Sequence, residues 1–583
     1  MVEPERPLTP LDWAVLIATL AAFVGYGLWR ARGTRDLEGY LVAGRSLPWP
    51  AVALSVMATQ ASAITFLSTP GQGFVDGLRF VQFYFGLPLV MVVLCVTAVP
   101  AYRALRVYTA YEYLERRFDR KTRTLASALF LIQRGLSAGL TLYAPALVLS
   151  ALLGWEMRWT CVLLGGLAVV YTSWGGSRAV SHAHVLQFLI ILGTLALVVV
   201  LVLARLPSGV SFGDGIALAG RLGRINAVNF RFDPNDRYNF WSGLIGGFFL
   251  QLSYFGADQS QVGRYLTGRS TTETRLGLLF NGLFKVPMQF GILLLGVLLF
   301  VLDLFLPSPL SFNPLESERL AHGAHATEWR ALEARHERAD AREAGAARTF
   351  VLARHAHDAA RAGAAGAELS DAERDARAAR ADAARLIERA DPGAPSGDTN
   401  YIFFGFVRRL LPAGVVGLVF AAIFAASMNS SSAELNALAS TTVVDVLRAS
   451  GGGAAPVAGR DAARAVWRSR FITLGWTAFA IGFAEYASRL GSLIEAVNIL
   501  GSLFYGTILG IFLTAFLLRS VRGTAVFTAA LIAEAIVLAC FRFTHLSFLW
   551  YNLVGCAVVM AVASLLSVAL DRGRPQAPVP AAR

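Results

Sequence analysis

Charge is scarce in this sequence. Only 16% of its 583 residues are charged, whereas 55% are hydrophobic and the mean hydropathy is +0.53. Soluble domains carry about 25% charged residues, so this composition argues against a soluble globular protein. The scarcity of charge predicts an integral membrane protein.

Cysteines and catalytic motifs are also few. The four cysteines, Cys95, Cys161, Cys540 and Cys556, all lie in apolar segments without C-x-x-C spacing, which favours packed thiols over disulfides or a metal site. The sequence contains no Walker motif, no H-E-x-x-H and no recognisable set of nucleophile, base and orienting residue. We therefore expect a protein that is not an enzyme.

Long apolar stretches are abundant. A spanning helix needs roughly 20 apolar residues to cross a bilayer core of about 30 Å. Thirteen stretches meet this need, and they predict an all-α fold: 10–30, 47–71, 77–101, 122–153, 157–174, 180–204, 240–266, 272–305, 410–446, 467–489, 491–519, 523–542 and 546–570. The first stretch lacks a basic leader and a small-residue cleavage site, so we expect it to be retained.

The formal net charge of +13 comes from basic loops. Loops such as 103–123, and the tail that begins at 571, follow odd-numbered crossings. The positive-inside rule then predicts a multi-pass protein of the cell (inner) membrane with its N-terminus outside and its C-terminus in the cytoplasm. This distribution makes nucleic acid an unexpected partner.

One segment, 313–400, is polar and rich in Ala, Arg and Glu. It reads as two helices, with Thr327 and Ser370 as N-caps and Glu373 completing a capping box with Ser370. We expect an extracytoplasmic helical hairpin. Five of the eight histidines lie here, without metal-ligand spacing, and they predict solvated helix faces: His322, His325, His336, His355 and His357.

Two apolar stretches are interrupted by small and polar residues. "SVMATQASAITFLSTPGQG" lies in the second stretch and "QLSYFGADQSQVGRY" in the seventh. Paired interrupted helices five apart are typical of inverted-repeat transporters, in which broken helices expose backbone carbonyls near the membrane midplane. Small-residue helix packing would explain either segment alone, but the pair favours a transporter.

These motifs, together with "YTSWGGSRAVSHAHVLQ" and "SMNSSSAELNALASTTVVD", make the chain resemble the solute:sodium symporter family. The resemblance covers nearly everything except the polar insert, and it implies two inverted five-helix repeats with broken core helices 1 and 6. The implied organisation follows the chain: 1–46 preceding helix and loop, 47–204 core helices 1–5, 205–239 extracytoplasmic loop, 240–305 core helices 6–7, 306–400 insert, 401–519 core helices 8–10, and 520–583 two peripheral helices with a cytoplasmic tail.

The family's sodium site, carried over residue by residue, falls on core helices 1 and 8. Its residues are Ala58, Ala61, Ala426, Asn429 and Ser430. The three alanines would offer backbone carbonyls, Ser430 its hydroxyl and Asn429 its amide oxygen. Hard cations prefer such oxygen ligands. Most members have serine where this chain has Asn429, so we expect the site to survive with altered geometry.

A second departure lies on core helix 5, where His184 replaces a typical aspartate. The positions of the family's second sodium site on helix 8 are Ser432 and Ala433, so we expect a single sodium per cycle. The carboxylate of Glu434 could instead pair with His184 and couple transport. A titrating histidine keeps a proton-assisted cycle open, whereas a solvated His184 at the headgroup level is the alternative.

The sugar-transporting branch implies a substrate cavity, with Tyr254 as an inner gate that can stack on a sugar ring. The corresponding positions here are Gln60, Thr65, Gln251, Tyr254, Lys285 and Asn498. The helix 2 position that is acidic in that branch is Tyr84, which weakens the sugar assignment.

Two intramembrane cations bear on the substrate. Lys285 lies about 10 residues into an apolar stretch, or roughly 15 Å deep, where a lysine cannot easily reach the interface. If Arg134 also faced the cavity, a carboxylate would be favoured, because arginine offers a bidentate fork. If Arg134 lay toward the cytoplasm, a neutral polyol would be favoured.

The main prediction is a sodium-coupled symporter that imports a small polar solute, a sugar or polyol first, by alternating access. The alternatives are a symporter for a sugar acid or other carboxylate, with proton assistance through His184 open, and a membrane solute sensor that does not transport. The expected partners are sodium, the solute and the lipid bilayer.

Overall fold

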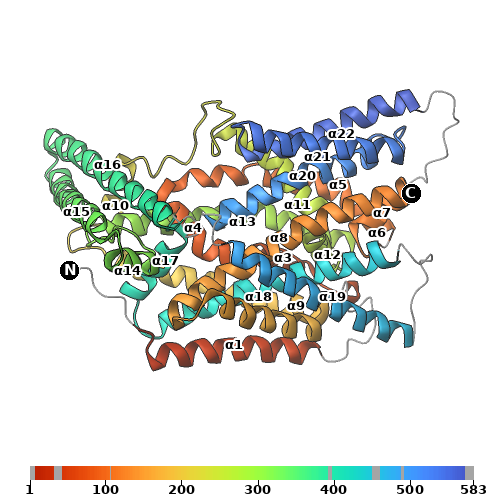
Figure 1. The fold of residues 1–583 in the computed structure, drawn as a ribbon, viewed down its shortest axis with the longest axis horizontal. Coiled ribbons are helices and arrows are strands. Elements are labelled where there is room, and N and C mark those ends of the chain that lie inside the picture. Colours follow the sequence, from red (N-terminus) through yellow and green to blue (C-terminus); the bar gives the residue numbers. More distant parts are fainter. Residues whose placement is uncertain are drawn as a thin grey trace.

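The computed structural model describes residues 7–31, 43–105, 107–391, 397–448, 460–487 and 492–570. These residues form helices joined by short connections, and the only β pairing among them is the bridge between Leu47 and Gly268. Figure 1 shows a long helical body with a helical hairpin across one end. The predicted all-α fold is confirmed.

The first half of the chain, up to residue 303, contains the following helices in chain order. They are α1 (Pro10–Ala31), η1 (Ala43–Arg45), α3 (Trp49–Gln60), α4 (Ala63–Asp76), η2 (Gly77–Tyr84), α5 (Leu87–Val96), α6 (Ala98–Ala104), α7 (Ala110–Arg117), α8 (Arg120–Leu153), α9 (Met157–Ala204), α10 (Phe212–Arg221), η3 (Ser242–Gly246), α11 (Gly247–Gly256), α12 (Gln259–Tyr265) and α13 (Thr271–Asp303).

The second half begins with the polar insert and ends with the last apolar helices. Its helices are α14 (Pro314–His322), α15 (Ala326–His355), α16 (Ala359–Ala390), α17 (Thr399–Leu410), α18 (Val415–Thr441), η4 (Thr442–Arg448), α19 (Arg460–Ala487), α20 (Leu493–Leu517), α21 (Gly523–Phe543) and α22 (Phe548–Leu570).

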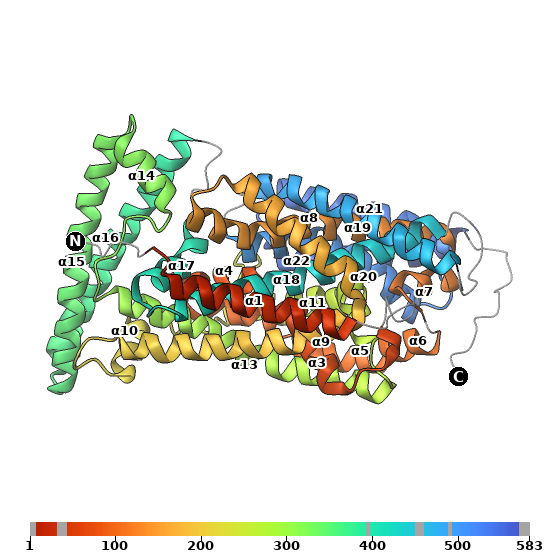
Figure 2. The ribbon, with the colours of Figure 1, turned by 90° about the horizontal axis from the view of Figure 1, so that it is seen from below.

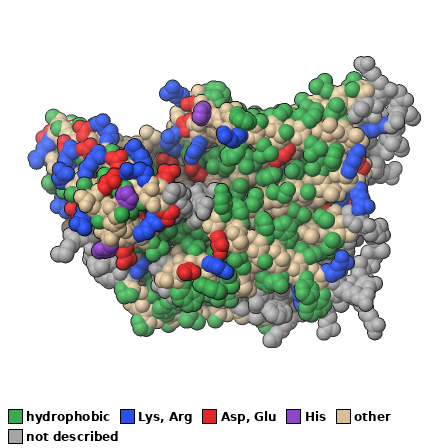
Figure 3. All heavy atoms as spheres, in the orientation of Figure 1, with side chains coloured by type: hydrophobic (Ala, Val, Ile, Leu, Met, Phe, Trp, Pro, Cys, Tyr) green, Lys and Arg blue, Asp and Glu red, His purple; other side chains and the backbone are tan. Residues whose placement is uncertain are grey.

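The helical body is apolar on its surface. In Figure 3, hydrophobic side chains cover its middle, whereas charged side chains gather over the hairpin end. Eight helices among the described residues are long and apolar enough to cross a membrane. The chain is therefore a multi-pass membrane protein, although fewer helices meet this measure than the thirteen stretches predicted.

Three kinds of difference separate the predicted stretches from the observed helices. The stretches 47–71 and 240–266 are each split by a break, as the interrupted sequences predicted. The stretch 77–101 starts as a 3₁₀ helix. The stretches 157–174 and 180–204 both fall in the helical element α9, within which Met157–Val169 and Ala183–Ala204 are separate apolar segments.

The polar insert forms the predicted hairpin, but its caps lie elsewhere. Helix α15 starts after His325, and α16 starts after Asp358, whose side chain accepts from the amide of Arg361. Ser370 lies inside α16 and donates to the carbonyl of Gly366. The predicted caps were wrong because the alanine-rich segment before Ser370 is itself a strong helix former.

The insert histidines differ in their surroundings. His336 is buried in the hairpin interface with 2% of its surface exposed, so the prediction of solvated histidines is wrong for this residue. His355 pairs with Asp214, with 3.0 Å between Nε2 and Oδ2. Among the described residues, no group of three or more His, Cys, Asp or Glu side chains could hold a metal ion.

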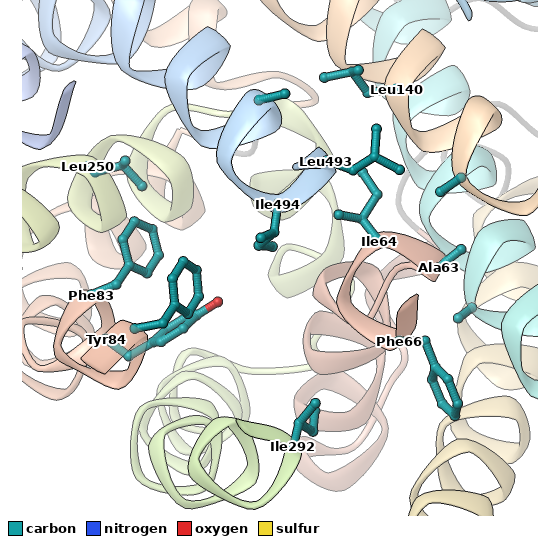
Figure 4. Packing of buried hydrophobic residues seen from close by; sticks show 14 of the residues in the cluster. Ala63, Ile64, Phe66, Phe83, Tyr84, Leu140, Leu250, Ile292, Leu493 and Ile494 are labelled. Carbon is teal, nitrogen blue, oxygen red and sulfur yellow. The ribbon is translucent and has the colours of Figure 1, made fainter. Parts of the chain in front are cut away.

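Buried apolar side chains join the broken helix to its neighbours. Figure 4 shows Ile64 of α4 beside Leu493 of α20, with Phe83 near Leu250. Next to the hairpin, the ring of Phe74 makes edge contacts with the rings of Phe300 and Phe312. The hairpin end of α4 is thereby packed into the body.

Candidate functional site

The first helix break lies between α3 and α4. Ala61 ends α3 with φ −81° and ψ 69°, and Ser62 caps α4 by accepting from the amide of Thr65. The Thr65 hydroxyl donates to the carbonyl of Gln60 at 3.1 Å. Polar and small residues in "TQASAIT" therefore end one helix and start the next, and they leave helix-terminal carbonyls available to a ligand.

The second break lies between α11 and α12. Ala257 ends α11, and the carboxylate of Asp258 caps α12 by accepting from the amide and hydroxyl of Ser260. Asp258 is 2% exposed. This break places a carboxylate deep in the protein, where capping alone does not balance its charge.

A cavity of about 110 Å³ lies between these breaks. All six predicted substrate residues line it: Gln60, Thr65, Gln251, Tyr254, Lys285 and Asn498. Other lining residues include Tyr84, Gln133, Ser137, Thr141, Ser430 and Tyr505. The structure thus brings the predicted residues together around one space, while their role in binding stays a prediction.

Hydrogen bonds hold several lining side chains in place. The Gln60 amide donates to Asn281 at 2.9 Å, and the Asn498 amide donates to the carbonyl of Ile494 at 2.6 Å. The Tyr254 hydroxyl accepts from the Gln261 amide at 2.6 Å. The cavity wall is therefore largely formed before any solute arrives.

Lys285 enters the cavity from α13. Its side chain is 2% exposed, and its ammonium nitrogen lies 5.6 Å from the centre of the Tyr84 ring. No carboxylate among the described residues pairs with it. A buried ammonium without an opposite charge is costly, so this cation is available to an anionic ligand.

Arg134 also faces the cavity, but its charge is already engaged. Its guanidinium contacts the carboxylates of Asp258 and Glu434, the latter at 3.0 Å. It also donates to the Tyr505 hydroxyl at 2.6 Å, and that hydroxyl donates to Asp258 at 2.8 Å. Arg134 thus joins helices α8 and α18 to the break before α12.

Asp258 is a site residue that the sequence analysis did not select. The sequence could have indicated it, because an aspartate in the middle of an apolar stretch is as unusual as Lys285 and Arg134, which were selected. Its partners could not be read from the sequence, since Arg134 lies 124 residues away.

The predicted sodium residues lie where α3 meets α18. Ser430 of α18 donates its hydroxyl to the carbonyl of Thr59 of α3 at 3.2 Å. Asn429 is fully buried, and neither its amide oxygen nor its amide nitrogen has a hydrogen-bond partner among the described residues. Ala58, Ala61 and Ala426 are buried on the same two elements. An unpaired amide oxygen beside a helix break suits a hard cation.

The expected pairing of His184 with Glu434 is wrong. Glu434 contacts Arg134, whereas His184 is fully buried and lies 3.4 Å from the Ser55 hydroxyl. Burial also excludes the alternative of a solvated His184. The sequence could not foresee this, because the arginine that binds Glu434 comes from α8.

The second half of the first broken helix, α4, is held in place by its neighbours. Ser68 of α4 lies 3.2 Å from the Ser492 hydroxyl and accepts from the amide of Ile494 at 3.3 Å. Gly71 packs against the carbonyl of Thr399 in α17 so closely that a Cβ there would lie 2.0 Å from its oxygen. These contacts hold the second half of the broken helix against α17 and α20.

Two broken helices around a polar cavity in an apolar helical body are typical of multi-pass membrane transporters. Residues 40–317 match the family model described as "Sodium:solute symporter family". Over these residues, just under half of the chain, the sequence is similar to this family, which is a family of transporters and not of enzymes.

Curated relatives extend the comparison. The human sodium/iodide cotransporter is 34% identical over 48% of this chain and 44% of its own length. The human sodium-coupled monocarboxylate transporter 1 is 33% identical, and a putative sodium-dependent multivitamin transporter of Drosophila melanogaster 32%, each over 46% of this chain and 44% of its own length. The match thus spans less than half of these relatives.

A solved structure supports the fold. The substrate-bound outward-open Na⁺-coupled sialic acid symporter shares a TM-score of 0.72 at 20% identity, covering 96% of this chain and 98% of that one. This likeness concerns the fold alone.

Proposed function

We propose that the protein is a sodium-coupled symporter for a small anionic solute, a carboxylate before a sugar. The observation that carries the proposal is Lys285, a buried cation that faces the cavity without a carboxylate partner among the described residues. Arg134, by contrast, is occupied by two acids. The solute would supply the direct carboxylate partner that Lys285 lacks.

The relatives support an anion. Their names cover iodide, monocarboxylates and vitamins. The neutral sugar or polyol that the sequence favoured therefore gives way to the carboxylate alternative. A cavity of about 110 Å³ is also smaller than the roughly 300–1,000 Å³ of sites for drug-sized ligands, which suits a small solute.

Formal charges around the cavity support one sodium for each anion. Lys285 and Arg134 balance Asp258 and Glu434, so the empty cavity is neutral. Sodium at the α3–α18 site adds one positive charge, and a monovalent anion beside Lys285 cancels it. Because uncompensated buried charge is costly, each ligand lowers the cost of binding the other.

Alternating access would use the two broken helices. Sodium between α3 and α18 would hold the first break in place, and the solute would then bind between the breaks. Rocking of the helices that carry the breaks against α8 and α18 would expose both ligands to the other side. With the predicted orientation in the cell (inner) membrane, the hairpin lies outside and transport is import.

A thermal-shift screen tests the proposal. Purified protein is heated with small monocarboxylates, halides, sugars or polyols, each in sodium and in potassium. We expect stabilisation by a carboxylate only in sodium, because a ligand that binds only the folded state raises the midpoint. Stabilisation by a neutral sugar, or equal stabilisation in potassium, would contradict the proposal.

A further inference from the structure

The hairpin of α15 and α16 contacts a helix of the cavity wall. Figure 2 shows the hairpin lying across the end of the body, next to α10 and α17. The family match ends at residue 317, before these two helices begin. The hairpin is thus an addition to the part of the chain that matches the family, and its contacts need a separate explanation.

Arg380 of α16 makes the central contact. Its guanidinium donates to the Ser308 hydroxyl at 2.5 Å and to the carbonyl of Pro309 at 3.2 Å. It also lies 4.8 Å from the ring of Phe312 and 5.8 Å from the ring of Phe74. Phe74 belongs to α4, whose first residues Ile64 and Thr65 line the cavity, so the hairpin directly contacts a helix of the cavity wall.

Two more contacts fasten the hairpin. The carboxylate of Glu373 accepts from Arg224 at 2.9 Å, and the carbonyl of Arg224 accepts from the amide of Leu78 just after α4. At the far end of α15, His355 pairs with Asp214. The hairpin therefore contacts the residues that flank α4, α10 and α13.

Glu343 lies at the centre of this interface without a balancing partner. It is 7% exposed, and one of its carboxylate oxygens has no hydrogen-bond partner among the described residues. Its neighbours Asp303, Asp340 and Glu373 are acidic, and Arg380 is the nearby cation. The remaining charged and titratable groups of the interface are His336 of α15, Arg377 of α16, Arg409 of α17, Arg224 after α10 and Asp398 before α17.

We propose that Glu343 is a proton-binding site that controls the docking of the hairpin on α4 and on residues 308–312. When Glu343 is protonated, the hairpin stays docked. When Glu343 is ionised, it adds an unpaired negative charge near Asp303, Asp340 and Glu373 in a buried interface, and the hairpin loosens. The inference goes beyond transport itself, and only its effect on turnover rests on the proposed function.

The direction of the pH effect follows from the titratable groups. Burial and the neighbouring acids raise the pKa of Glu343 to about 8 and that of Asp340 to about 6. Burial and Arg380 lower the pKa of His336 to about 4. Because the pKa of Glu343 is raised in the docked state, docking is favoured at low pH. Docking lowers the pKa of His336, so this residue opposes docking only below pH 6.5, the ordinary pKa of histidine. Between pH 6.5 and 8, Glu343 acts alone, and docking weakens by about tenfold per unit of rising pH.

Spin-label distances in the full-length protein test the site. Labels are placed at the exposed positions Ser208 and Arg348, in a background whose four cysteines are replaced, and distances are measured in lipid nanodiscs from pH 6.5 to 9. We expect one narrow distance at pH 6.5 and a second population that grows as the pH rises to about 8 and then levels off. Arg380→Ala should show that second population at every pH, which proves that the assay detects undocking.

Glu343→Gln separates the proton site from other causes. The neutral amide copies the protonated acid, so this variant should keep the narrow distance up to pH 9. Glu337→Gln, on the exposed face of the same helix, should behave as the wild type. A wild-type distance that ignores pH, or a Glu343→Gln variant that still responds to pH, would overturn the proposal. Neither result depends on sodium or solute, so the proposed function is tested separately.

Discussion

Lys285 offers the sharpest test of the anion site. Lys285→Met keeps a long apolar side chain but removes the ammonium that faces the cavity. At about 4 Å and an effective dielectric constant of 20, a carboxylate and an ammonium attract by ~4 kcal/mol. Truncating one partner of a buried charged pair costs about 2–5 kcal/mol, which corresponds to a loss of affinity of roughly 30-fold to 4,000-fold.

Isothermal titration in sodium, with a carboxylate identified by the thermal-shift screen, measures this loss. The methionine variant should fold at least as stably as the wild type, because it removes a buried charge that has no carboxylate partner among the described residues. Lys285→Arg retains the charge and should retain part of the affinity. If Lys285→Met binds the carboxylate as tightly as the wild type, the cation does not hold the solute and the charge argument fails.

Three further predictions concern the ions. Ser430→Ala should weaken sodium binding by roughly tenfold or more, since it removes one charge-assisted oxygen contact worth about 1.5–3 kcal/mol; sodium-dependent thermal stabilisation measures it, with Ser440→Ala, several turns along α18, as the control. Asp258→Asn should lower the free energy of unfolding by about 3–5 kcal/mol, because Arg134 loses one of its two buried counter-charges; chemical denaturation in detergent measures this, and unchanged stability would show that the network is not structural. Transport of one sodium with one monovalent anion should carry no net charge, so uptake into proteoliposomes should be independent of an imposed potassium diffusion potential, whereas acceleration by an inside-negative potential would indicate additional cations.

The membrane class and the helix breaks could be predicted from the sequence, because they depend on local properties. Apolar length decides whether a helix can cross a bilayer, and "TQASAIT" and "FGADQSQ" show by their small and polar residues where a helix must stop. The two helices of the hairpin could also be predicted, since alanine-rich segments have a high intrinsic helix propensity. The predicted cap at Ser370 was wrong because the alanine-rich residues before it are also helical, so that α16 begins at Ala359.

Charge pairing was decided by the tertiary structure alone. Glu434 and His184 lie on neighbouring helices, yet an arginine from α8 binds Glu434 and leaves the histidine beside Ser55. Which buried cation pairs with an acid, and which has no carboxylate partner in the described part of the chain, depends on residues more than a hundred positions apart. Sequence by itself determined that this protein crosses a membrane around broken helices and carries cations in its interior. Only the packing of α8, α12 and α18 decided that Arg134 pairs with two acids while Lys285 has no carboxylate partner among the described residues, because electrostatic pairing acts through space.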